Sequence, residues 1–360
     1  MYKVDFSLNE WNFTVYFNNR EDYLYYKEVI SNSVYEMSHK NNGELIKIYY
    51  LKDKKLYVEK LDETKKKKRE VISSFQDEYY DKYGMTFISS ENRYLINRID
   101  KNTFSLLCKD SLKRPELIYL IREIYVRLEE NNKSLFIHGN GIKIDNKGVI
   151  IMGGSGSGKT TFMLKLFESD EKSLEYLSND RIFLTQNDNI EYFPIPLILA
   201  SGTAKNIRPI FTYLKNKQSL YDSSFKNNML YSEKNNIKFE LFKKYIPEIF
   251  PNCKLVEKSN IDVIIMPKMN FDIDDISVRQ VCDYAETMPM CFTPTDSESQ
   301  RKPWIMERDN SDEILKKQSI KKLKEKTNQG IVYKVNYNPN MDSIILRHKI
   351  SEKVLERIPW

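Results

Sequence analysis

The sequence predicts a mixed α/β fold, in which a β-rich region at residues 1–110 precedes an α/β domain with a mixed central sheet. Three observations predict it. Short aromatic and β-branched runs separated by polar turns fill the first region, as in strands. Apolar residues then recur at helical spacing over residues 115–130. Finally, the apolar run Gly148–Met152 and the amphipathic segment Thr161–Phe167 predict a strand and a helix that flank eight Gly- and Ser-rich residues.

The composition is that of a globular protein. The 360 residues are 41% hydrophobic and 30% charged, and no run approaches the ~18 consecutive apolar residues of a membrane span. The first residues lack the charged-then-apolar layout of a secretion signal. The four cysteines are scattered and show no metal or disulfide spacing. We therefore expect a cytoplasmic protein with reduced thiols and no membrane span.

The charge balance does not favour a nucleic-acid partner. The net charge of +6 comes from 57 basic against 51 acidic residues, a modest excess for this length. The one dense basic run, Lys65–Arg69, is bounded by Asp62, Glu63 and Glu70. A solvated loop or strand end is the expected structure there.

The β-rich region is expected to hold strands at Phe13–Phe17, Leu56–Val58 and Phe104–Leu107 and a helix over residues 21–38. Pro115 stands at a favoured first-turn position of the helix that follows. Next, Leu135–Gly139 and Gly141–Ile144 read as strands, and the tight turn Asp145–Gly148 leads into the Gly148–Met152 strand. A β-hairpin therefore feeds the Gly-rich segment.

The rest of the chain alternates between strands, loops and helices. We expect a strand that ends at Asp180, a strand at Ile182–Leu184, a long loop over 190–210 and a Lys/Asn-rich surface excursion or lid over 215–245. A buried strand at Ile261–Met266 is expected to stop at Pro267. A basic helix over 311–328 and a strand over 331–335 follow. The expected domains are residues 1–110, 111–300 and 301–360, the last being a helix and strand packed on the core.

The segment between the predicted strand and helix matches the phosphate-binding loop G-x-x-x-x-G-K-[ST]. Its glycines let the backbone turn so that successive N–H groups point inward, and the helix N-terminus adds partial positive charge. Lys159 is expected to reach the β- and γ-phosphates, and Thr160 to ligate Mg²⁺. The sequence therefore predicts that ATP or another nucleoside triphosphate binds with Mg²⁺ at Gly153, Gly154, Ser155, Gly156, Ser157, Gly158, Lys159, Thr160 and Thr161.

Turnover also needs a metal-holding acid and a group that orients or deprotonates the nucleophile. Asp180 is the candidate metal ligand because it closes the next apolar strand. Asn179 can hydrogen-bond to phosphate, metal-bound water or substrate but cannot accept a proton as a carboxylate does. Arg181 either neutralises transferring charge or pairs at the surface. His138 lies in the hairpin that leads into the loop, but a histidine among apolar neighbours is usually structural.

These segments together resemble the catalytic domain of the HPr kinase/phosphorylase family, whose phosphate loop is related to that of phosphoenolpyruvate carboxykinase. The resemblance covers roughly residues 115–210. It is carried, in order, by Ser134–Gly139, Gly148–Ile151, the phosphate loop and Leu177–Arg181. It looks closest to the branch in which a Leu-x-Asn-Asp-Arg stretch follows the loop.

The resemblance implies an HPr-kinase-like P-loop domain and an ATP-dependent kinase. Its acceptor would be a hydroxyl, often a serine, of a peptide, protein or small molecule, and ring assembly in the family implies a homo-oligomer. His138 matches the histidine that the family places near the phosphates, and Asp180 matches the second acid of its Asp-Asp pair. The first acid, the family's general base, is Asn179 here. Either Asp180 serves both purposes, another acid substitutes, or the chain only binds nucleotide.

Two function classes therefore stay open. In the first, a P-loop kinase, the catalytic set is Lys159, Asp180, His138 and Asn179, with Thr160 and Asp180 holding the metal. In the second, a nucleotide-binding sensor with little or no turnover, Asn179 explains the missing base. A transport or translational NTPase is disfavoured, because the sequence has no Leu-Ser-Gly-Gly-Gln-like stretch and no downstream Asn-Lys-x-Asp segment.

Overall fold

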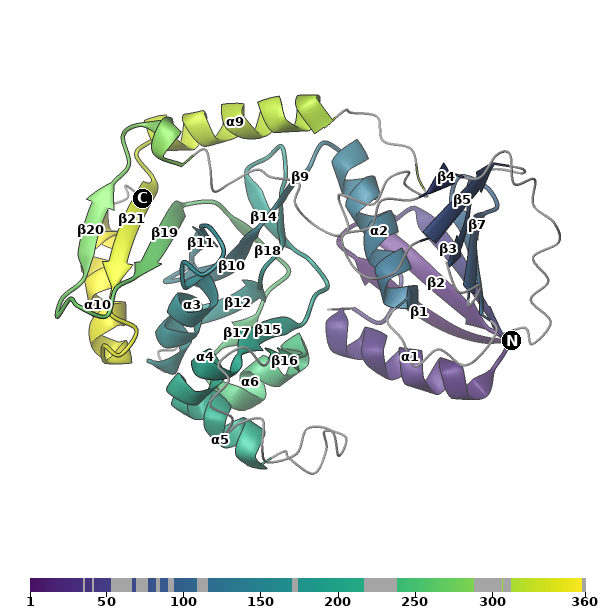
Figure 1. Ribbon diagram of the computed structural model, residues 1–360, viewed down its shortest axis with the longest axis horizontal. Coiled ribbons are helices and arrows are strands. Elements are labelled where there is room, and N and C mark those ends of the chain that lie inside the picture. The colour runs from purple at the N-terminus through teal and green to yellow at the C-terminus, as the bar shows by residue number, and fades with distance from the viewer. Residues whose placement is uncertain are drawn as a thin grey trace. The chain divides into compact units, whose positions relative to one another are not determined.

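The computed structural model describes residues 1–34, 36–40, 42–52, 67–68, 77–81, 85–89, 94–108, 116–169, 174–216, 238–287, 306 and 312–357. The fold is mixed α/β, as the sequence predicts (Figure 1). The chain divides into two compact units, residues 1–134 with 294–312 and residues 135–293 with 313–360. Among the described residues, no helix is both long and apolar enough to cross a membrane.

The first unit is built on an eight-stranded sheet of order β1-β2-β3-β8-β7-β6-β5-β4. β3 runs parallel to β2 and to β8, and the other neighbours are antiparallel. Its elements are β1 Tyr2–Leu8, β2 Trp11–Phe17, α1 Arg20–Ser33, β3 Leu45–Lys52, β4 Lys67–Lys68, β5 Asp77–Asp81, β6 Met85–Ser89, β7 Tyr94–Arg98, β8 Thr103–Cys108 and α2 Glu116–Asn131.

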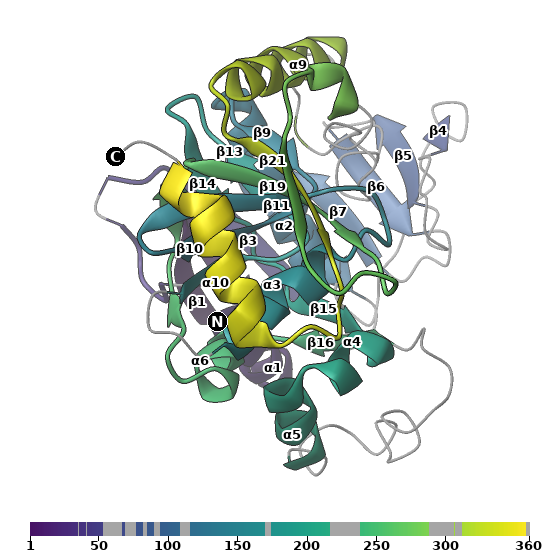
Figure 2. The same cartoon turned by 90° about the vertical axis from the view of Figure 1, so that its left-hand side faces the viewer.

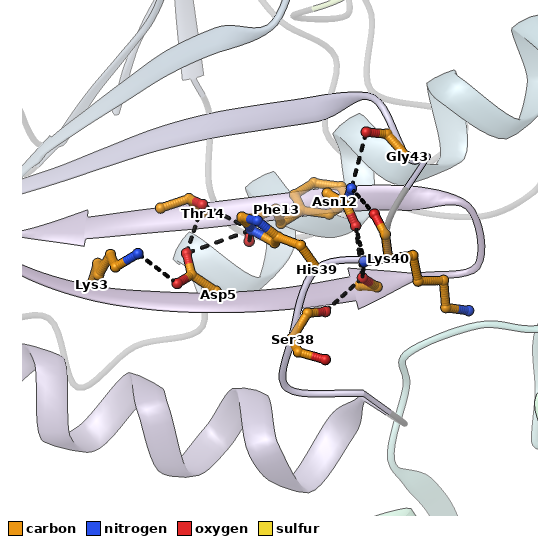
Figure 3. A network of polar contacts seen from close by, with 10 residues as sticks. Lys3, Asp5, Asn12, Phe13, Thr14, Ser38, His39, Lys40 and Gly43 are labelled. Atoms are coloured by element: carbon orange, nitrogen blue, oxygen red, sulfur yellow. Dashed lines mark hydrogen bonds and ion pairs between the residues drawn. The ribbon is translucent and has the colours of Figure 1, made fainter.

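A polar network ties the segment after α1 to the β1–β2 hairpin (Figure 3). The side chain of Asn12 accepts from Lys40 N at 2.7 Å and from Ser7 Oγ at 2.8 Å. Its amide donates to the carbonyls of Lys40 at 2.8 Å and Gly43 at 3.0 Å. All four hydrogen-bonding positions of this buried side chain are therefore used.

The second unit holds a seven-stranded mixed sheet of order β17-β12-β10-β11-β19-β21-β20. Its strands are β10 Gly139–Ile144, β11 Lys147–Met152, β12 Leu174–Ser178, β17 Lys254–Leu255, β19 Val263–Met269, β20 Ser277–Gln280 and β21 Val332–Tyr337. A four-stranded sheet comprises β9 Leu135–Ile137, β13 Ile182–Leu184, β14 Asn189–Tyr192 and β18 Lys258–Asn260, and a two-stranded sheet comprises β15 Leu197–Ala200 and β16 Lys238–Leu241.

The second unit also contains six α-helices among the described residues. They are α3 Lys159–Glu168, α4 Ser201–Asn206, α5 Arg208–Asn216, α6 Ile246–Ile249, α9 Asp312–Asn328 and α10 Ser343–Lys353, with short 3₁₀ turns at Lys243–Tyr245, Tyr284–Glu286 and Leu355–Arg357. Figure 2 shows α10 beside α3 on one face of the seven-stranded sheet. Phe162 and Leu166 of α3 and Leu346 and Ile350 of α10 are buried in the same core cluster. Each such side chain stabilises the fold by about 1.5–3 kcal/mol.

The predicted β-hairpin before the phosphate loop is confirmed. β10 and β11 pair antiparallel, and Asp145 and Asn146 form a two-residue turn with φ of 50° and 64°. Asp and Asn tolerate this left-handed conformation, which two-residue hairpin turns favour. β11 then pairs in parallel with β19, so the sheet becomes mixed at the phosphate-loop strand.

Two expectations about individual elements are corrected, and one further element is found. Residues 190–210 are not a long loop, since they include β14, β15, α4 and the start of α5. Pro267 does not stop its strand: β19 runs on to Met269, and Pro267 pairs in register with Val335 of β21. Its missing N–H is tolerated because β11 pairs with β19 only as far as Ile265. The chain also continues past β21 into α10, which was not expected.

Some expectations fall outside the described residues. These are the strand at Leu56–Val58, the first-turn Pro115, the ends of the basic run at 65–69, and residues 217–237 of the predicted excursion. The basic helix over 311–328 is confirmed as α9, and the strand over 331–335 as β21.

Candidate functional site

Three strand ends bring the predicted site residues to one edge of the sheet. β11 ends at Met152 and continues into the phosphate loop. β10 is antiparallel to β11 and begins at Gly139, opposite Met152, so His138 precedes it at that edge. β12 is antiparallel to β10 and ends at Ser178, opposite Gly141. Residues 179–181 therefore emerge beside the loop.

The loop needs glycine where its backbone turns. Gly156 and Gly158 have φ of 79° and 89°, which side-chain-bearing residues rarely adopt. At Gly158 a Cβ would clash with Met269 Cγ and lie 2.7 Å from Tyr337 Oη. The Tyr337 hydroxyl donates to the Gly158 carbonyl at 3.0 Å. The end of β21 therefore holds the end of the loop.

The interior of the loop fits a chain of phosphates. A Cβ at Gly154 or Gly156 would meet nothing within 4 Å, so the backbone there stands open. The buried Ser157 hydroxyl has no hydrogen-bond partner among the described residues. Lys159 is buried, and its ammonium donates to the carbonyls of Gly153 at 2.9 Å and Gly154 at 3.2 Å. The ammonium thus lies folded over the loop, where phosphate oxygens would be stronger acceptors.

The groups around Lys159 shift its pKa in opposite directions. Burial lowers the pKa of Lys159, the Asp180 carboxylate counteracts this, and the Arg181 guanidinium lowers the pKa further. A bound polyanion would relieve both unfavourable contributions, since it supplies negative charge to two neighbouring cations.

The oxygen donors near the loop suit Mg²⁺. Thr160 Oγ1 donates to Asn179 Oδ1 at 3.2 Å, which leaves the lone pairs of the hydroxyl available for a cation. Asp180 adds a partly exposed carboxylate. Within the described ranges, no group of three His, Cys, Asp or Glu side chains could hold a metal by itself. Mg²⁺ would therefore need phosphate oxygens and water as further ligands, as is usual for this ion.

Asp180 has a left-handed backbone with φ of 65°. Its N–H donates to Asn140 Oδ1 at 2.8 Å. Asn140 belongs to β10 and is fully buried, and its Nδ2 has no hydrogen-bond partner among the described residues. Asn140 therefore supports the backbone turn that presents the Asp180 carboxylate. Sequence reasoning missed it, although a polar residue in a buried strand beside His138 was a usable signal.

Arg181 joins His138 to Asp180. Its NH1 donates to His138 Nδ1 at 2.7 Å, to Asp180 Oδ2 at 2.7 Å and to the Asp180 carbonyl at 2.8 Å. Because guanidinium can only donate, Nδ1 accepts, and the ring proton of neutral His138 lies on Nε2, which is 3.5 Å from Asp180 Oδ1. Burial, and then the Arg181 charge, lower the pKa of His138 to about 4. His138 is therefore neutral at pH 7 and unable to accept a proton at Nε2.

The structure thus brings together His138, Lys159, Thr160, Asn179 and Asp180, which the sequence singles out. Thr161, in contrast, shares a hydrogen bond of 3.0 Å with Thr203 of α4, so its hydroxyl is used for packing. Besides Asn140, sequence reasoning missed Met269 and Tyr337, which come from strands far along the chain.

Comparison with known proteins shows likeness only to solved structures. No family model and no curated protein matches the chain. Among solved structures it is similar to the Hpr(Ser) kinase/phosphatase from Coxiella burnetii, with 16% identity and a TM-score of 0.21. The match covers 41% of this chain and 72% of that one. A likeness this weak carries no inference about function.

Proposed function

We propose that the chain is an ATP-dependent kinase that transfers the γ-phosphoryl group to a hydroxyl, in the presence of Mg²⁺. The observation that carries the proposal is that a phosphate loop and a charged cluster lie side by side. A phosphate loop with an open interior is joined, by the Thr160–Asn179 hydrogen bond, to a cluster of Asp180, Arg181 and His138. A loop alone binds phosphate; a carboxylate and a second cation beside it are what transfer also needs.

Binding and charge neutralisation fall to the loop. The loop N–H groups and Lys159 hold the β- and γ-phosphates, and Thr160 with Asp180 holds the cation. Mg²⁺, when bound, supplies positive charge to the phosphate oxygens. Arg181 adds a fixed positive charge next to the transferring group. Because phosphoryl transfer has a loose transition state, such positioning supplies most of the catalysis.

Within this proposal, Asp180 receives the proton of the attacking hydroxyl. Asn179 is buried and engaged with Thr160, and an amide is no base. His138 already carries a proton on Nε2 and directs it toward Asp180. The role of His138 is to hold the carboxylate together with Arg181. The hydroxyl acceptor, of serine type on a peptide, protein or small molecule, would lie beside Asp180.

The test is mass spectrometry of candidate peptides, proteins and hydroxyl metabolites after incubation with ATP and Mg²⁺. The proposal expects one acceptor to gain a single phosphoryl group, and fragmentation to place it on an oxygen. Lys159→Ala should lose this activity, whereas Lys215→Ala, at an exposed position of α5, should keep it. ATP binding without a phosphorylated product in any pool would overturn the kinase proposal.

That outcome would support the second candidate, a nucleotide sensor. Two observations favour it: an amide stands where an acid would serve as base, and Arg181 already pairs with the remaining carboxylate. A sensor should bind ATP–Mg²⁺ and change its protease sensitivity on binding. Asp180→Ala should then leave nucleotide binding largely intact.

A further inference from the structure

The phosphate loop has a second flank, opposite the His138–Asp180 side. β11, β19 and β21 run parallel in register, so their carboxyl ends meet at the same edge of the sheet. In open parallel sheets, ligands bind outside this edge. The Asp180 cluster lies on the β10 and β12 side of β11, whereas the turns after β19 and β21 lie on the other side.

The turn after β19 is held firmly. Asn270 N donates to the Tyr337 carbonyl at 2.9 Å, and Asn270 Oδ1 accepts from Asp272 N at 3.0 Å. Asn338, which follows β21, donates through Nδ2 to the carbonyls of Phe271 at 3.2 Å and Ile273 at 3.0 Å. The backbone of the turn is therefore fixed to β21 and to the residue after it.

This fixed turn presents an aromatic ring to solvent. Phe271 is 62% exposed, the largest exposure of any aromatic residue among the described exposed hydrophobics. Because most of the ring is not removed from water, its position adds little to the stability of the fold. Exposed aromatic rings on fixed backbones are a means of stacking on planar ligands.

The turn also starts next to the loop. Met269, the last residue of β19, packs against Gly158, and Tyr337, the last residue of β21, donates to the Gly158 carbonyl. Phe271 follows Met269 by two residues, which is at most about 7 Å of chain. The sugar and base of a nucleotide whose phosphates lie in the loop are long enough to span this distance.

We propose that residues 270–273 form the nucleobase subsite, in which the Phe271 ring stacks on the purine of the bound nucleotide. The inference rests on the proposed nucleotide binding and deepens it. A purine offers a larger face for stacking than a pyrimidine. Asp272, the exposed residue that follows Phe271, offers acceptors for an exocyclic amino group such as that of adenine.

The experiment compares two ligands by calorimetry with Mg²⁺: ATP, which has a base, and inorganic tripolyphosphate, which has none. Phe271→Ala should weaken ATP binding about tenfold and leave tripolyphosphate binding unchanged. The matched control is Ile345→Ala, at a 49% exposed position of α10, which should change neither. Lys159→Ala should weaken both ligands.

A second variant makes stacking visible. In Phe271→Trp, ATP should bind as in the unchanged protein and quench the added tryptophan fluorescence, whereas tripolyphosphate should not. Wild-type affinity of Phe271→Ala for ATP would overturn the subsite. Failure of the unchanged protein to bind either ligand would overturn nucleotide binding and the subsite together. If ATP binding depends on Phe271 but no acceptor is phosphorylated, the subsite stands and only the kinase proposal fails.

Discussion

Two histidine–aspartate pairs of this chain share a geometry but differ in surroundings. In the first unit, His39 Nε2 lies 3.5 Å from Asp5 Oδ1, and in the second, His138 Nε2 lies 3.5 Å from Asp180 Oδ1. Both histidine side chains are 34% exposed. The distance within each pair and the exposure of its histidine therefore do not distinguish the two pairs. The groups that surround each pair do.

The His39 pair is surrounded by groups that fasten backbone (Figure 3). His39 Nε2 contacts the Phe13 carbonyl at 3.1 Å and Thr14 Oγ1 at 3.0 Å, and Asp5 also accepts from Thr14 and pairs with Lys3. These contacts join two strands to the segment after α1, so the pair is structural.

The His138 pair instead faces cations and an open loop. Arg181 donates to both members, and Lys159 contributes to lowering the pKa of His138. Two positive charges gathered beside a carboxylate serve an anion better than they serve packing. The charge around such a pair, and not the distance between its members, therefore points to function.

The largest expected effect is a difference in catalysis between variants of the two aspartates. Asp180→Asn should lower phosphoryl transfer by about 10²- to 10³-fold, because it removes the proton acceptor and metal ligand. Asparagine tolerates the left-handed backbone at this position, so the fold should persist. Asp5→Asn is the matched control and should keep full turnover. Equal rates for the two variants, measured with ATP and the identified acceptor, would contradict the assignment.

A glycine pair sharpens the role of the loop. Gly158→Ala should lower both the affinity for ATP and the free energy of unfolding. The left-handed backbone alone should lower the free energy of unfolding by about 1–2 kcal/mol, and the clash of the new Cβ with Met269 should lower it further. Gly154→Ala meets open space and should fold as before. Denaturant unfolding and calorimetry measure the two effects. A stable, ATP-binding Gly158→Ala would show that the loop is built differently.

Two buried asparagines should separate stability from activity. Asn12→Ala removes four hydrogen bonds and should lower the free energy of unfolding by about 1–3 kcal/mol without changing turnover. Asn140→Ala removes one, to Asp180 N, and should cost about 1 kcal/mol. It should nevertheless lower kcat while ATP affinity stays. An unchanged kcat in Asn140→Ala would reduce Asn140 to a packing residue.

The smallest effect is a titration of the protein free of Mg²⁺ and nucleotide. His138 should take up its proton near pH 4, not near the ordinary pKa of 6.5. The unfolded chain is protonated first, so this group's contribution to stability is present above pH 6.5 and is lost as the pH falls toward 4. Imidazole NMR follows the protonation, and His138→Gln identifies the signal among three histidines. A midpoint near 6.5 would mean that the ring is neither buried nor faced by Arg181.

The sequence could predict those features that depend only on neighbouring residues. The phosphate loop carries its own glycines and follows a β-branched strand, and Asp145 and Asn146 mark the hairpin turn before it. Since that hairpin places the start of β10 beside the end of β11, the placement of His138 beside the loop follows from local signals as well. The placement of Asp180 also depends on the pairing of β12 with β10.

Long-range contacts could not be predicted in this way. Asn140 meets Asp180 40 residues later, and Tyr337 meets Gly158 across 179 residues. The run of β19 through Pro267 depends on where a neighbouring strand stops pairing. α10 was missed because Ile344 and Ile345 are exposed while Leu346 is buried, which hides its helical period.

The hydrogen bond from Tyr337 to Gly158 can form only late in the synthesis of the chain. At roughly 5–20 residues per second, the ribosome needs on the order of 10–40 seconds to make the 179 residues between the two partners. During that interval the newly made glycine-rich turn lacks the strands that brace it. A nascent chain should therefore gain affinity for nucleotide only after β21 has left the exit tunnel.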